Sequence, residues 1–312
     1  MPVVLGICAA AKIPASRQLM PLAYAAGIGG VITMVGTPPN IIVSGVLTSF
    51  GYESFSFFEF AWIGIPLTFV VIAYMMFIGK YLLPKAELDA DQEIEQEIEA
   101  TVTDSKKQIV SGLILAVCII VMALDLKAIS LEMTAIVGAL VCVLTGCLTE
   151  KQAYSAIDWV TIFLFAGMMP VSAAMDKTGA GKLIAEWAVS LMGGSPTPII
   201  MTSVLFIISC TLTQFMSNTA AAALLAPVGV AISQQLGASP KAVLMAIGVA
   251  ASCAFATPVG TPPCTLVLGP GGYKFMDYVK VGVPLVILCF IVSIIVLSLI
   301  HISEPTRRRG IS

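Results

Sequence analysis

The chain of 312 residues has little charge and few of the groups that catalysis uses. Only 11% of its residues are charged, against roughly a quarter in a soluble domain, and 58% are hydrophobic. Together with a mean hydropathy of +0.99, this excludes an ordinary soluble domain and predicts an all-α polytopic membrane protein. A net charge of −2 without a basic stripe argues against nucleic acid as a partner.

Histidine and paired cysteines are scarce as well. The single histidine, His301, lies near the chain end, no HExxH motif occurs, and none of the eight cysteines forms a CxxC pair. The sequence therefore lacks the usual means of hydrolysis in a bilayer, and a membrane-embedded enzyme is a remote alternative. We expect no enzymatic activity and no cofactor, and we interpret the cysteines as buried reduced thiols.

What the chain does contain is the same five residues twice, Val-Gly-Thr-Pro-Pro at residues 35–39 and 259–263. Both copies lie in apolar segments where a helix would otherwise cross the bilayer unbroken. Two consecutive prolines remove two backbone donors, and in lipid such a break persists where protein, water or a bound ion satisfies the freed backbone groups. Matched breaks in two halves of a chain point to the binding site of a secondary transporter.

The two copies belong to longer matching segments. Gly36 and Gly260 are 224 positions apart, and at that offset Arg17 aligns with Lys241, so the helix leading into each break is duplicated. The balance of Lys and Arg predicts that residues 80–107 face the cytoplasm. With this orientation the two copies start on opposite sides of the membrane, and we predict an inverted repeat.

The pattern of apolar runs divides the chain into parts. Residues 1–85 form the end of an N-terminal repeat, with a break at residues 36–40 and then one span. Residues 86–107 hold eight of the eighteen acidic residues and form a solvated linker. The C-terminal repeat, residues 108–296, contains spans at 109–124, 131–148 and 158–174, an interfacial helix at 176–194, a re-entrant hairpin at 196–235, a broken helix at 242–268 and a last span from 279. Each hairpin arm is short for a full crossing, which favours a re-entrant hairpin.

Both ends of the chain look artificial. The first apolar run opens abruptly at Met1, and residues 297–307 match the translation of a sequencing-library adapter in one frame. We therefore expect an N-terminally truncated fragment whose residues 297–312 are an artefactual tail. His301 and the terminal arginines carry no weight in the functional interpretation.

A polar cluster at residues 213–219 falls in the middle of the predicted hairpin. Its uncharged hydrogen-bonding side chains suit recognition of a carboxylate or oxyanion beside a sodium ion; they belong to Thr213, Gln214, Ser217, Asn218 and Thr219. The unwound loops add carbonyl oxygens for a cation and half-helix amides for an anion. Alone, the Ser-Asn-Thr triplet could equally be a helix N-cap, but beside a duplicated proline break it indicates a binding site.

The Ser217-Asn218-Thr219 tip and the duplicated loops resemble the divalent anion–sodium symporters of the ion transporter superfamily, which carry di- and tricarboxylates or sulfate. The resemblance covers residues 1 to about 296. It implies an inverted-repeat secondary transporter of the cell inner (plasma) membrane, with elevator-type alternating access and a homodimeric full-length parent. It also implies one Ser-Asn-Thr tip for each loop, and the first of these would lie before Met1.

The resemblance assigns roles to individual residues of this chain. One sodium ion would be surrounded, mainly through carbonyls, by Thr213, Met216, Asn218 and Gly260, and Gly36 would belong to the other sodium site. The substrate would touch Asn218, Thr219, Thr261 and Pro262 on one side, and Thr37 and Pro38 on the other. The first loop ends in Asn40 as the family pattern has it, whereas the second ends in Cys264, which leaves the contact on that side open.

A proton-coupled antiporter or metalloid-oxyanion transporter of the same superfamily is the second hypothesis. Such proteins often place an ionisable residue within the membrane. The candidates, Asp125, Glu132 and Asp158, fall near predicted helix ends, where interfacial anchors are favoured. The leading hypothesis is sodium-coupled symport of a small divalent anion, with sodium, the anion and the lipid bilayer as partners; succinate, malate, citrate and sulfate all stay open.

Overall fold

The computed structural model describes residues 2–11, 13–84, 105–124, 130–157 and 197–303, together with single positions between 159 and 190. No strand occurs in these parts of the chain, so the predicted all-α fold is confirmed. Most of the predicted linker, span 158–174, the interfacial helix at 176–194 and the end of the tail lie outside the described residues.

Thirteen α-helices are described in chain order: α1 (Pro2–Ala11), α2 (Leu19–Gly29), α3 (Pro38–Ser49), α4 (Ala61–Tyr74), α5 (Lys80–Leu82), α7 (Ser105–Ala123), α8 (Leu131–Leu144), α9 (Glu150–Ser155), α12 (Pro198–Leu212), α13 (Asn218–Leu236), α14 (Pro240–Ser252), α15 (Pro262–Leu268) and α16 (Phe275–Ser303). A π-helical segment, Met75–Gly79, joins α4 to α5. Because α7 begins at Ser105, the last residues of the predicted linker belong to this helix.

Four stretches are long and apolar enough to cross a membrane, judged by length and composition: Ala61–Leu82, Lys106–Ala123, Asn218–Leu236 and Phe275–Leu299. The prediction that both hairpin arms are too short is therefore wrong for α13. This helix continues through Pro227 and ends after 19 residues at Gly237, whose φ of 64° suits a residue without a side chain.

Two loops interrupt the apolar helices. The first loop, residues 33–37, separates α2 and its terminal 3₁₀ turn from α3, and the second loop, residues 253–261, separates α14 from α15. The predicted break at residues 36–40 is corrected by this finding, because Pro38 and Pro39 already belong to α3. A proline at the first helical position loses no intrahelical hydrogen bond, so the pair starts a helix rather than interrupting one.

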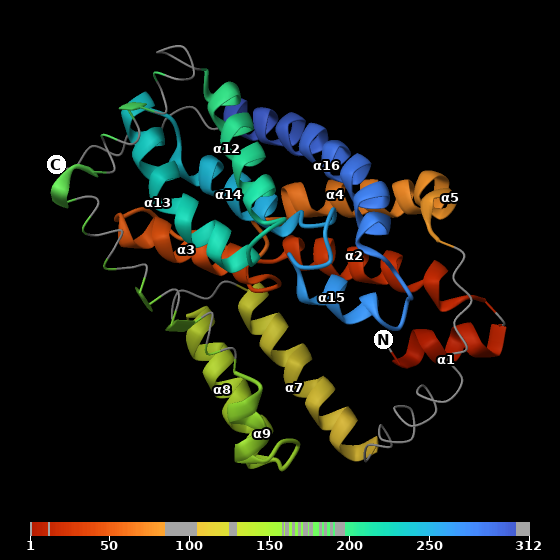
Figure 1. The fold of residues 1–312 in the computed structure, drawn as a ribbon. Coiled ribbons are helices and arrows are strands. Elements are labelled where there is room, and N and C mark those ends of the chain that lie inside the picture. Colours follow the sequence, from red (N-terminus) through yellow and green to blue (C-terminus); the bar gives the residue numbers. More distant parts are fainter. Residues whose placement is uncertain are drawn as a thin grey trace.

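The two broken helices pack against each other head to tail (Figure 1). The first arm of each contacts the second arm of the other, α2 against α15 and α14 against α3. At one end, the Tyr273 hydroxyl after α15 donates to Ser16 O before α2 (2.7 Å); at the other, Lys241 in α14 pairs with Glu59 beyond α3 (2.8 Å). This antiparallel arrangement is that of an inverted repeat.

The contact of Tyr273 is insensitive to physiological pH. Burial raises the pKa of its hydroxyl, which lies in the connection between α15 and α16. The hydroxyl therefore stays protonated, donates to Ser16 O and accepts from Met20 N at 2.8 Å.

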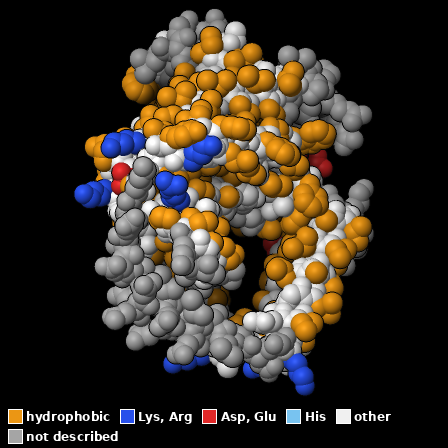
Figure 2. All heavy atoms as spheres, turned by 90° about the vertical axis from the view of Figure 1, so that its right-hand side faces the viewer, with side chains coloured by type: hydrophobic (Ala, Val, Ile, Leu, Met, Phe, Trp, Pro, Cys, Tyr) orange, Lys and Arg blue, Asp and Glu red, His pale blue; other side chains and the backbone are white. Residues whose placement is uncertain are grey.

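The remaining helices surround this pair. α16 packs against α4, α12 and α14, and α13 packs against α3 and α14. α7 and α8 pack on each other and lie with α9 in the lower part of Figure 1, and an apolar cavity of about 580 Å³ lies between α7 and α8. Apolar side chains cover much of the coloured surface in Figure 2, as expected for a protein whose solvent is lipid.

Candidate functional site

The hairpin tip, residues 213–217, joins α12 to α13 and faces the second loop. Ser217 is the N-cap of α13, and its Oγ accepts from Ala220 N at 3.2 Å. The capping role that the sequence left open for this triplet is thus real for Ser217. The next residue, Asn218, lies in the first turn of α13 with its amide beside Gly260 O of the second loop, so one triplet can both cap the helix and contribute to a binding site.

Thr213 and Asn218 connect the tip to the second broken helix. The Thr213 hydroxyl donates to Ala251 O in the last turn of α14 at 2.8 Å. Hydrogen-bond geometry assigns the Asn218 amide nitrogen to the same side, where three acceptors lie within reach of its two hydrogens: Gly260 O (2.7 Å), Thr213 Oγ1 (2.7 Å) and Ala251 O (3.1 Å). The structure therefore brings together three of the predicted site residues, Thr213, Asn218 and Gly260.

The approach of tip and loop requires glycine at position 260. A Cβ built there would lie 2.5 Å from Thr213 O and 2.6 Å from the Ala254 Cβ. Gly36, at the matching place in the first loop, is equally crowded, since its Cβ would meet Gly30 O and, at 2.8 Å, Thr33 Oγ1. Each loop is folded too tightly for any other residue.

The first loop lies beside the end of α14, where the second loop begins. The Thr37 hydroxyl oxygen lies 3.4 Å from the Oγ of Ser252, the last residue of α14 before the break. Thr37 and Thr261 have matching backbones, with φ/ψ of −144°/140° and −132°/140°, and both are buried. The two breaks thus meet at one place, with their threonines in equivalent conformations.

The other predicted site residues lie next to these contacts. Pro38 and Pro262 are exposed first residues of α3 and α15, while Thr219 and Met216 lie half-buried beside Asn218 and Ser217. Among the described residues, no side-chain hydrogen bond joins these four to the loops. They lie near the site because each is next in sequence to a residue of the tip, of α13 or of a loop.

The tip and both loops carry no charged residue. Among the described residues no group of three or more His, Cys, Asp or Glu could hold a metal ion, and the oxygens present are carbonyls and hydroxyls. Such ligands suit a hard cation of low charge better than a transition metal. An anion would find backbone amides at the N-terminus of α13, whereas α3 and α15 each begin with two prolines, which have no N–H.

Of the ionisable residues of the proton-coupled hypothesis, the structure describes Glu132, which is not at this site. Glu132 is exposed in the first turn of α8, after the N-cap Ser130, where a carboxylate is favoured by the helix dipole. Asp125 and Asp158 lie outside the described residues.

A second duplicated pattern escaped the sequence analysis. Residues 63–67 read Ile-Gly-Ile-Pro-Leu in α4, and residues 281–285 read Val-Gly-Val-Pro-Leu in α16. A Cβ on Gly64 would lie 2.8 Å from Ile32 Cα, and one on Gly282 would lie 2.7 Å from Ala256 Cα. Ile32 and Ala256 are equivalent at the offset of 224, and both lie four residues before the repeated glycine, Gly36 or Gly260. A search for matches at offsets near 224 would have found this pair.

The fold and the site together define a class: a helical membrane transporter built from two inverted repeats with broken helices. The family model described as "CitMHS: Citrate transporter" matches residues 1–231 and, in a second match, 120–309. The chain belongs to this citrate transporter family.

Curated relatives agree with this class. An "Uncharacterized transporter" of Haemophilus influenzae is 34% identical over 287 residues, which cover 88% of this chain and 60% of the relative. The "Uncharacterized transporter YfbS" of Escherichia coli is 40% identical over 168 residues, 53% of this chain and 27% of the relative. The "Sodium-dependent dicarboxylate transporter SdcS" of Staphylococcus aureus is 26% identical over 286 residues, 85% of this chain and 54% of the relative.

These names describe transporters rather than enzymes, as the sequence analysis predicted. The chain spans 60% or less of the length of these three relatives.

Proposed function

We propose that the protein is a sodium-coupled secondary transporter of small divalent anions, with di- and tricarboxylates first and sulfate as the further candidate. One observation carries the proposal: Thr213 of the hairpin tip and Asn218, the first residue of α13, bind carbonyl oxygens at the end of α14 and in the second loop through uncharged side chains. The citrate transporter family and the sodium-dependent dicarboxylate relative support the substrate class and the coupling ion.

Sodium is proposed to bind where the tip meets the second loop, at Thr213, Met216, Asn218 and Gly260, with Gly36 at a second sodium site. The Gly260 carbonyl has two lone pairs, so it can accept the Asn218 amide and still face a cation. Sodium would hold the tip closed on the loop.

The anion would bind beside that cation and touch Asn218, Thr219, Thr261, Pro262, Thr37 and Pro38. These groups are neutral, so the sodium charge would provide much of the attraction for a divalent anion. Hairpin and broken helices would then move together against the remaining spans, in an elevator-type cycle. The proposed setting is the inner membrane, as a homodimer, with residues 86–107 in the cytoplasm.

The test is uptake of labelled succinate and citrate by cells that express the protein from its complete gene, in sodium or potassium buffer. Wild type is expected to take up anion in sodium, and Asn218→Ala to lose this uptake at unchanged membrane expression. Thr213→Ala should lose it as well.

Thr202→Ala is the matched control, because this threonine lies in α12, the helix that ends at the tip, and its hydroxyl donates to Pro198 O within the same helix (2.7 Å). Normal uptake by Asn218→Ala would refute the site assignment. Uptake that follows a pH gradient and ignores sodium would favour the proton-coupled alternative.

A further inference from the structure

The first loop is held by the helix that follows it. Asn40, in the first turn of α3, is fully buried, and its amide nitrogen donates to Thr33 O at 3.0 Å and to Val31 O at 3.4 Å. One side chain therefore satisfies two carbonyls that the break in the helix sets free. The carbonyl groups of Val31 and Thr33 therefore have a hydrogen-bond donor within the first broken helix itself.

The second loop lacks this internal bridge. Cys264 stands at the position of Asn40, and its thiol lies 4.0 Å from Ala254 O, at the limit of a sulfur hydrogen bond. Thr265 donates to Pro258 O at 2.6 Å and so holds the part of the loop nearest Gly260. The earlier part of the loop, residues 253–257, must find its partners elsewhere.

Part of that support comes from the other repeat. Phe255 O, the counterpart of Val31 O at the offset of 224, accepts from the hydroxyl of Tyr24 in α2 at 2.7 Å. The two rings also pack, with centroids 5.0 Å apart.

The rest comes from Gln214, which the sequence analysis noted but gave no role. Its amide nitrogen donates to Cys253 O (3.2 Å) and to Cys210 O (2.9 Å), and its amide oxygen accepts from Ala256 N (3.1 Å). Its own carbonyl accepts from the Thr257 hydroxyl at 2.8 Å. One residue of the tip thus binds three residues of the second loop.

Gln214 also shares a peptide plane with the Thr213 carbonyl. That carbonyl oxygen lies against Gly260, where the tip approaches the loop most closely. Since this peptide unit is rigid and includes the Cα of Gln214, hydrogen bonds that hold the Gln214 side chain in place also restrict how the Thr213 oxygen can turn.

We propose that Gln214 is a positioning residue for the coupling ion: it ties the second loop to the hairpin tip, as Asn40 ties the first loop to α3, and thereby sets the sodium affinity of the site where the tip meets the second loop. The inference rests on the proposed sodium coupling. The second loop is held by the tip, so a cation that bridges the two benefits from a contact already made, whereas the carbonyls of Val31 and Thr33 at the first break are bound by Asn40 of the helix that follows it.

The experiment measures uptake against sodium concentration, together with the melting temperature of the purified protein without sodium. Gln214→Met keeps the length of the side chain and removes its amide. We expect the sodium concentration for half-maximal uptake to rise about tenfold, the effect of losing one or two hydrogen bonds, with maximal uptake retained. Thr257→Val, which removes a single hydroxyl with little change of shape, should shift it in the same direction by a smaller factor.

Gln234→Met is the matched control, since this exposed glutamine of α13 donates to the Tyr52 hydroxyl (3.2 Å), far along the helix from the tip. Its sodium dependence should equal that of wild type. Adding Cys264→Asn to Gln214→Met should lower the half-maximal sodium concentration again, because an amide at position 264 can reach the second loop as Asn40 reaches the first.

The outcomes separate the two proposals. Wild type that takes up anion without any sodium dependence refutes the proposed function itself. Sodium-dependent wild type with an unchanged Gln214→Met and an unchanged Thr257→Val overturns the role of Gln214. So does a Gln214→Met protein that melts earlier and loses uptake equally at every sodium concentration, and so does a double variant that shows no recovery.

Discussion

The two breaks share the residues Val-Gly-Thr-Pro-Pro and equivalent conformations at Thr37 and Thr261, yet different parts of the molecule bind their carbonyl groups. At the first break Asn40 of the following helix binds them, whereas at the second break Gln214 of the hairpin tip and Tyr24 of the other repeat do so. The duplicated residues therefore account for the break itself, and the residues around each break differ. The second loop is the one that is bound to the hairpin tip.

Replacing the loop glycines should have the largest effect. In Gly260→Ala the new methyl group would collide with the Thr213 carbonyl, and in Gly36→Ala with groups of its own loop, so both variants should lose anion uptake altogether. The measurement is sodium-dependent uptake at matched membrane expression.

Gly269→Ala is the control, because this glycine has nothing within 4 Å of its Cβ position and keeps a negative φ. Gly260→Ala and Gly36→Ala should differ in their effect on thermal stability. Gly36→Ala should also lower the melting temperature without sodium, since it strains a loop from within, and equal uptake by Gly260→Ala and wild type would contradict the close approach of tip and loop.

Asn40→Leu should have an intermediate effect. The variant removes both hydrogen bonds to the first loop, and the free energy of unfolding should fall by about 1–3 kcal/mol. The loss should be partly offset because the buried Asn40 Oδ1, which has no hydrogen-bond partner among the residues that the structure describes, is removed too. Thermal unfolding with and without sodium measures it.

The same shift is expected in both conditions, unlike the sodium-specific effect expected of Gln214→Met. Cys264→Ala, at the equivalent position, serves as the control and should shift the melting temperature less. A larger shift for Cys264→Ala than for Asn40→Leu would contradict the contrast between the loops.

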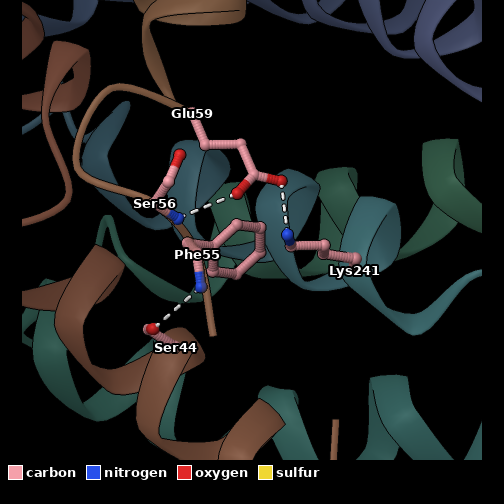
Figure 3. A network of polar contacts seen from close by, with 5 residues as sticks. All are labelled: Ser44, Phe55, Ser56, Glu59 and Lys241. Carbon is pink, nitrogen blue, oxygen red and sulfur yellow. Dashed lines mark hydrogen bonds and ion pairs between the residues drawn. The ribbon is translucent and has the colours of Figure 1, made fainter. Parts of the chain in front are cut away.

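The smallest effect is expected at the N-terminal end of α14, the end farther from the second loop. Lys241 pairs with Glu59 at 2.8 Å, while Glu59 also accepts from Ser56 N and Lys241 lies over the Phe55 ring (Figure 3). Because both side chains are partly exposed, a double-mutant cycle with Lys241→Met and Glu59→Gln should give a coupling of about 0.2–1 kcal/mol that falls with added salt.

Arg17 is the equivalent cation of the first repeat, and it is exposed with no ion pair to another described residue. Arg17→Met should therefore change the melting temperature less than Lys241→Met. A salt-independent coupling at Lys241 would show that the pair is more deeply buried than the structure has it.

Local sequence patterns predicted where the helices break, but they could not predict contacts between segments that are far apart in the chain. Gly-Thr-Pro-Pro in an apolar run identifies an interrupted helix from the residues alone, although the rule that proline can start a helix would have placed the restart at Pro38 and not after Asn40. The contact of Tyr24 with Phe255 joins residues 231 positions apart, and only the packing of α2 against the second loop creates it.

The site was predictable in its residue types and less so in its supports. Thr213 and Asn218 stood out as part of a polar cluster in an apolar segment and Gly260 as part of the duplicated break, while their assignment to a sodium site came from the resemblance to the divalent anion–sodium symporters. Gln214 stood in the same cluster, but its role depends on where the second loop lies. The departure at Cys264 likewise becomes intelligible once the loop's other partners are seen.

Direct sodium binding tests the central claim that tip and second loop form one cation site. Equilibrium binding of radioactive sodium to the purified protein should be saturable in wild type and strongly weakened in Asn218→Ala, with Thr202→Ala unchanged. Equal, saturable binding by wild type and Asn218→Ala would contradict the account.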